Sequence, residues 1–101
     1  MLLSWFDASE AKAFGLSMAD VWIERMPLAE NLNEKQYAAK SKKIFDIMLL
    51  RISGFKMKQK KKLNIYKTAQ LGNAFKWALK DAGYEDRYVS QLTEWLVSRL
   101  Q

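Results

Sequence analysis

Apolar residues recur at every third or fourth position along almost the whole chain, and this spacing constrains the fold more than any other feature. Such spacing is typical of amphipathic α-helices, and the clean alternation of polar and apolar residues that predicts strands is missing. The only proline is Pro27, and proline disfavours helical geometry in the residue before it. The sequence therefore predicts an all-α protein, either a four-helix bundle or a compact orthogonal array of four helices.

Capping signals divide the chain into four predicted helices, at about residues 8–26, 34–58, 64–82 and 86–100, within a single helical domain over residues 1–101. The run Asp7-Ala8-Ser9-Glu10 has the form of a capping box, in which Glu10 reaches back to the helix start. Asn33 and Asp86 have the short polar side chains that cap helix N-termini. Gly83 is expected to end the third helix, because glycine readily adopts the left-handed conformation found there.

The second predicted helix contains a glycine and apolar residues on two sides. Gly54 costs about 1 kcal/mol relative to alanine inside a helix. It can therefore end the helix, but we expect the helix to continue for at least one further turn. The main apolar stripe runs from Tyr37 to Phe55, while Ile47 and Leu50 project from the other side. We therefore expect this helix to contact more than one neighbour.

Positive charge is concentrated in the middle of the chain. Residues 1–34 sum to −4, residues 35–67 to +10 and residues 68–101 to zero. The densest run contains five lysines: Lys56, Lys58, Lys60, Lys61 and Lys62. Such a run attracts polyanions, because each neutralised phosphate releases counterions. The alternative is a solvated surface at a helix C-terminus, where positive charge complements the helix dipole. With only four arginines in the chain, any nucleic-acid binding would be largely nonspecific.

One face of the third predicted helix combines aromatic and amide side chains. Its members are spaced i, i+4, i+7 and i+11: Tyr66, Gln70, Asn73 and Trp77. This face lies away from the apolar stripe of the same helix, and two lysines border it. It could stack an unpaired base or provide an aromatic anchor for a protein. The alternative is that Tyr66 and Trp77 pack under the N-terminal segment or the connection that follows the first helix.

Several kinds of chemistry are disfavoured by composition, and we predict no catalytic residues, no metal site and no cofactor. The chain has no cysteine and no histidine, so thiolate chemistry and the usual general base near neutral pH are excluded. The four glycines are scattered singly and form no phosphate-binding loop. The acidic residues of the first third lack the spacing of a calcium loop and are interpreted as a solvated face: Asp20, Glu24, Glu30 and Glu34.

We therefore expect a small helical interaction or adaptor protein rather than an enzyme. Its protein partner is unidentified, and the positive charge of the chain would favour a partner with acidic groups. The alternative is nonspecific nucleic-acid binding through the lysine run. A third hypothesis is attachment to an anionic membrane surface, with Phe55, Met57 and Leu63 as apolar contacts. Homodimerisation through the oppositely charged segments is a further alternative. No apolar run is long enough to span a bilayer and the apolar start is too short for a signal peptide, so we expect a cytoplasmic protein without integral membrane association.

Overall fold

Helices make up nearly all of the chain, so the all-α prediction is confirmed. The computed structural model describes residues 2–28 and 31–101, among which no strand occurs. The long helices are α2 (Ser9–Arg25), α3 (Glu34–Gln59), α4 (Ile65–Asp81) and α5 (Asp86–Leu100). A short helix, α1 (Leu2–Phe6), precedes them, and a 3-10 turn, η1 (Lys60–Lys62), joins α3 to α4.

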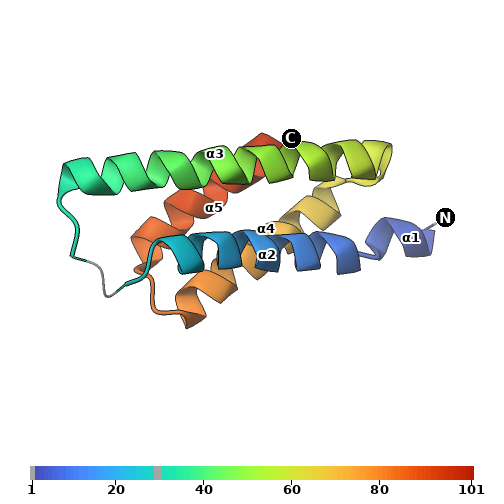
Figure 1. Cartoon of the computed structure of the whole chain (residues 1–101). Helices are drawn as coiled ribbons and strands as arrows, with labels where there is room; N and C mark the ends of the chain where they lie inside the picture. Colours follow the sequence, from blue (N-terminus) through green and yellow to red (C-terminus); the bar gives the residue numbers. More distant parts are fainter. Residues whose placement is uncertain (1, 29–30) are drawn as a thin grey trace.

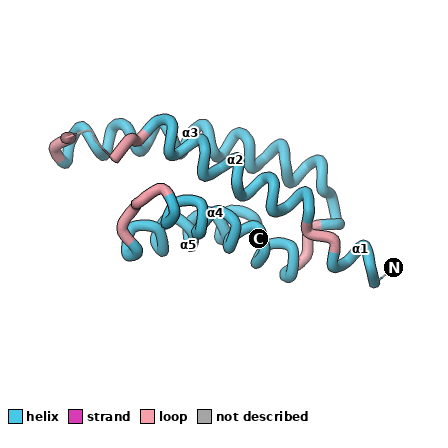
Figure 2. Tube along the Cα trace, turned by 90° about the horizontal axis from the view of Figure 1, so that it is seen from below, coloured by secondary structure: helices cyan, strands magenta, loops and turns pink. Residues whose placement is uncertain are grey.

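The long helices form a bundle of two crossed layers (Figures 1 and 2). Helices α2 and α3 run side by side in opposite directions in one layer, and α4 and α5 form the other. The most extensive contact between elements joins α2 to α4 across the layers. The resulting molecule is elongated, with extents of 50 × 24 × 18 Å. The N-terminus and η1 lie at the same end of it (Figure 1).

The core lies where α2 crosses α4. Trp22 and Met18 of α2, and Phe75 and Leu79 of α4, are completely buried. The close approach of the two helices depends on Gly15, because a Cβ at this position would overlap the carbonyl oxygen of Leu71. The helical stripes of the sequence therefore bury the residues that their spacing predicts.

Two of the predicted caps are confirmed. The Asn33 Oδ1 accepts a hydrogen bond from the Gln36 backbone N–H at 2.8 Å, and the Gln36 side chain accepts one from the Asn33 N–H at 3.1 Å. This reciprocal pair satisfies two amide donors at the start of α3. At the end of α4, Gly83 has a φ of +99°. The Tyr84 N–H donates to the Leu79 carbonyl at 3.1 Å, which completes a left-handed helix stop.

Of the other two predicted caps, one is half formed and one is wrong. At the start of α2 the Asp7 Oδ1 accepts from the Ser9 N–H, as predicted, but the N-cap residue is Ala8 and Glu10 is hydrogen-bonded to Gln59 instead of reaching back. Asp86 is the first residue of α5 and lies 3.7 Å from the Lys80 ammonium, so it forms an ion pair rather than a cap. In both places the acidic side chain is paired with a residue from a different helix.

Helix α3 continues through Gly54 to Gln59, as expected. It contacts both α2 and α5, which confirms that it has more than one neighbour. However, the side of the helix that carries Leu50 faces away from both, and Leu50 is 77% exposed. Of the two residues predicted to project from this side, Ile47 is half-buried against the core and Leu50 is exposed. Helix α1 was not predicted, because five residues are too few to establish a helical period.

Candidate functional site

The lysine run lies at the end of the bundle where α3 turns into α4. We call this region, with Lys56, Lys58, Lys60, Lys61, Lys62 and Lys67, the lysine-rich end. The first five of these side chains are exposed, and Lys67 is half-buried. Lys60 has a φ of +53°, a backbone conformation that glycine adopts more easily than lysine. Lysine at this turn position is therefore less favourable for stability than glycine would be.

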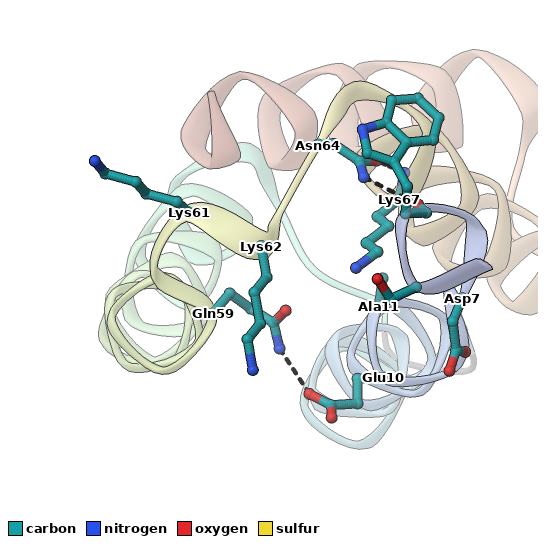
Figure 3. A pocket seen from close by; sticks show the side chains of 10 residues that line it. Asp7, Glu10, Ala11, Gln59, Lys61, Lys62, Asn64 and Lys67 are labelled. Atoms are coloured by element: carbon teal, nitrogen blue, oxygen red, sulfur yellow. Dashed lines mark hydrogen bonds between the residues drawn. The ribbon is translucent and has the colours of Figure 1, made fainter. Parts of the chain in front are cut away.

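Five of these six lysines line two neighbouring hollows. Lys61, Lys62 and Lys67 line a hollow of about 420 Å³ between η1 and the start of α2 (Figure 3). Lys56 and Lys60 line a neighbouring hollow of about 410 Å³ that reaches the end of α5. The Lys56 ammonium also donates a hydrogen bond to the carbonyl oxygen of Arg99 at 3.2 Å, which links α3 to α5.

Two hydrogen bonds fix the walls of the larger hollow. The Gln59 side chain is only 6% exposed, and its Nε2 donates to Glu10 at 2.7 Å, which joins the end of α3 to α2 (Figure 3). The Asn64 Nδ2 donates to the carbonyl oxygen of Trp5 at 3.0 Å, while its Oδ1 caps α4 by accepting from the Lys67 N–H. Asn64 therefore ties α1 to the start of α4.

The hollow presents charges of both signs. Lys62 and Lys67 share the hollow with Asp7 and Glu10, whereas the Lys61 ammonium points away from it (Figure 3). The Asp7 carboxylate accepts from the Ser9 Oγ at 2.6 Å and from the Ser9 N–H at 3.2 Å. These hydrogen bonds lower the pKa of Asp7, and the charge of Lys67 contributes to the same direction. Asp7 therefore stays negative at neutral pH.

An aromatic cluster forms one rim of this hollow. Trp5 stacks on Tyr66 with ring centroids 6.0 Å apart, and Phe6 meets Tyr66 edge-on at 5.2 Å. Trp5 remains 42% exposed and Phe6 52% exposed, while Tyr66 is half-buried beneath them. The alternative in which Tyr66 packs under the N-terminal segment is therefore the one observed, and the exposed rings belong to α1.

The predicted face of α4 is consequently split. Trp77 is 55% exposed, and the ammonium groups of Lys80 and Lys76 lie 5.1 and 5.3 Å from its ring centroid. It stands about 16 Å along the helix from Tyr66, from the rise of 1.5 Å per residue. Gln70 is half-buried and Asn73 is exposed between them. The structure thus provides no continuous Tyr66–Trp77 aromatic surface.

Sequence reasoning missed Trp5, Gln59 and Asn64 as parts of this site. The apolar start of the chain, which includes Trp5 and Phe6, was the available signal. Its meaning depended on the fold, because α1 is held beside the hollow by Asn64 and Tyr66, which lie about sixty positions further along the chain.

The described residues contain no group of three acidic side chains that could hold a metal ion, and Glu30 of the predicted acidic face lies outside them. No helix over residues 2–28 and 31–101 is long and apolar enough to cross a bilayer. Comparison of the chain with protein families, with curated proteins and with solved structures finds no match.

Proposed function

We propose that this chain is a helical protein-interaction module that binds an acidic protein through its lysine-rich end. The observation that carries the proposal is the hollow that three lysines line together with Trp5, which is 42% exposed. Tryptophan is a frequent energetic anchor of protein interfaces, and the excess of lysines at this end of the bundle favours acidic partners and speeds their association. A cytoplasmic location is part of this proposal.

The mixed charge of the hollow favours a protein over a nucleic acid. Asp7 and Glu10 face the lysines, and like charges placed opposite each other are costly. A continuous row of phosphates would meet both carboxylates. A protein segment can place acidic side chains against Lys61 and Lys62, and polar or basic groups against the carboxylates.

Affinity capture tests this proposal. The immobilised chain would be incubated with nuclease-treated cell extract, alongside a Lys61→Glu/Lys62→Glu variant. We expect a discrete protein that the wild type retains and the variant releases, with retention weakening as salt rises. A Lys35→Glu/Arg87→Glu variant makes the same change of charge at exposed positions, at the starts of α3 and α5, that do not line the hollow, and should retain the protein. Equal retention by all three chains would contradict a role for the lysine-rich end.

Nonspecific binding of single-stranded nucleic acid is the second candidate function, and the position of Trp5 beside Lys61, Lys62 and Lys67 is what favours it. An exposed ring next to lysines can stack a base while the lysines contact the backbone. If about five phosphates are neutralised, log K should fall with log salt at a slope of roughly −3.5 on single strands and −4.5 on duplex DNA. Trp5→Phe should then remove the tryptophan fluorescence change and Trp77→Phe should preserve it. A flat salt response would exclude this function.

A further inference from the structure

Helix α3 carries an apolar stripe on the side that faces away from the rest of the protein. Leu50 is 77% exposed and Met57 is 74% exposed. Together with the exposed Gly54, and with Ile47, which is half-buried against the core at one end of the stripe, they are spaced i, i+3, i+7 and i+10, which places them on one face of the helix. The opposite face of α3 is the one that enters the core, through Ile44, Met48 and Ile52. We call the first set the outer stripe of α3.

Gly54 at the centre of the outer stripe has no role that the fold explains. A Cβ at Gly15 or Gly72 would meet a neighbouring helix, and Gly83 has a positive φ. At Gly54, an added Cβ would have nothing within 4 Å. Glycine inside a helix costs about 1 kcal/mol relative to alanine, so this position is destabilising without any gain in packing. Glycine in such a place allows another backbone to approach closely.

A hollow borders the outer stripe where α3 passes α5. It has a volume of about 340 Å³, and its apolar lining comes from Leu49, Ile52 and Met57. Lys56 and Arg99 stand at its edge. A hollow of this kind, next to an exposed apolar stripe, suits a helix that lays one face on α3 and inserts a large apolar side chain beside it.

The charge of α3 selects the partner. The helix contains seven basic and two acidic side chains, and Arg51 and Lys58 are exposed along one edge of the outer stripe. Lys56 and Arg99 border the other edge, at the hollow. A second copy of the chain laid on this face would set basic residues against basic residues, which opposes self-association. An acidic helix would find complementary charge on both sides.

We propose that the outer stripe of α3 is the docking surface for an acidic amphipathic helix of a protein partner, which crosses α3 most closely at Gly54. This inference rests on the proposed function and names the form of the partner. A membrane surface fits this stripe less well, because the stripe is narrow and the neighbouring Phe55 packs inside the protein. Phe55 stacks on Phe14 at 4.2 Å, and Leu63 is half-buried.

A synthetic peptide tests the docking surface directly. The probe is a fluorescently labelled amphipathic helix with leucines at i, i+3 and i+7 and glutamates elsewhere, and its control replaces every glutamate with lysine. We expect saturable, salt-sensitive anisotropy changes with the acidic peptide only. Leu50→Glu and Gly54→Leu should each weaken its binding by about tenfold or more, because one sets like charges together and the other blocks the close approach.

Matched controls separate this inference from loss of fold and from failure of the proposed function. Leu16→Glu changes a residue on α2 that is 49% exposed and should leave binding unchanged, and thermal unfolding of each variant reports on folding. If the Leu50→Glu and Gly54→Leu variants still bind the acidic peptide and the Lys61→Glu/Lys62→Glu variant does not, the docking surface on α3 is overturned and the proposed function stands. Binding that no variant changes would contradict both.

Two further outcomes would also overturn the inference. The first is a homodimer in sedimentation equilibrium that Leu50→Glu converts to a monomer, because the occupant would then be a second copy. The second is binding to vesicles with anionic headgroups that Leu50→Glu abolishes, with no binding of the acidic peptide. A monomer that binds the peptide and ignores the vesicles is the expected result.

Discussion

Helices α2 and α3 lie side by side in one layer of the bundle, yet they use their surfaces differently. Helix α2 is pressed against α4 so closely that Gly15 cannot carry a side chain, and its central residues Met18 and Trp22 are fully buried. Helix α3 is the longest helix, but only one side of it enters the core. The identities of the α2 residues at this contact are thus explained by folding. The outer stripe of α3 is not, and its exposed apolar residues require another explanation.

The largest expected effect separates a core residue from a residue of the outer stripe. Phe75 is fully buried under α2, and Phe75→Ala should lower the free energy of unfolding by about 3–5 kcal/mol. Leu50→Ala also removes a large apolar side chain, but from an exposed site, and should change the free energy of unfolding by no more than about 0.5 kcal/mol. Urea unfolding followed by circular dichroism measures both. A large loss for Leu50→Ala would show that this side chain is covered in solution, and the contrast between α2 and α3 would fail.

A smaller but sharper effect is expected where α2 meets α4. Gly15→Ala would place its methyl group against the backbone of Leu71, which cannot move aside like a side chain. We expect a loss of roughly 1–3 kcal/mol in unfolding free energy, typical of overpacking in a tight contact. Gly72→Ala is the matched control, because its methyl group would meet the Val97 side chain at 3.0 Å, which can shift. Equal losses at the two positions would mean that α2 and α4 pack less closely than described.

The same contrast explains which parts of the molecule could be predicted from the sequence. The all-α fold and the buried stripes follow from apolar spacing, because a helix that packs on one side repeats every 3.6 residues. The caps that depend on neighbouring residues alone, such as Asn33, were also predictable. Glu10 was misassigned because its partner, Gln59, lies forty-nine positions away in the sequence. Local pattern contains no information on such a pair.

The candidate site was predictable in composition but not in shape. The lysine run is evident in the sequence, and its exposure was foreseeable. The hollow beside it depends on α1, which places Trp5 over Tyr66. A five-residue helix is too short to be identified by period, so the covering of Tyr66 remained one of two alternatives. Trp77, by contrast, is 55% exposed, so the packing alternative that holds for Tyr66 fails for Trp77.

The third prediction concerns how each helix of the pair begins. Helix α3 starts with the reciprocal bonds of Asn33 and Gln36, whereas the N-cap of α2 has no side-chain bond. Asn33→Ala should therefore cost about 1 kcal/mol. Ser9→Ala removes an exposed hydrogen bond to Asp7 at the start of α2 and should cost less than about 0.5 kcal/mol. Thermal and urea unfolding of the two variants gives the comparison. If they lose equal stability, α3 does not depend on its cap more than α2 does.

The smallest expected effect has the opposite sign and tests the purpose of the outer stripe. Gly54→Ala adds a methyl group into open space, so it should raise the free energy of unfolding by about 0.5–1 kcal/mol through helix propensity alone. The same methyl group stands where an acidic helix would approach most closely, and it should therefore weaken binding of the acidic peptide.

If Gly54→Ala gains stability and loses affinity for the acidic peptide, the glycine serves binding of the partner rather than folding. The two quantities are measured on the same variant, by urea unfolding and by peptide anisotropy. Gly15→Ala provides the reverse case, since it should destabilise the fold without touching the outer stripe. If Gly54→Ala gains stability and binds the peptide as well as the wild type, close approach at Gly54 is not required. The glycine would then have no explanation in either the fold or the proposed complex.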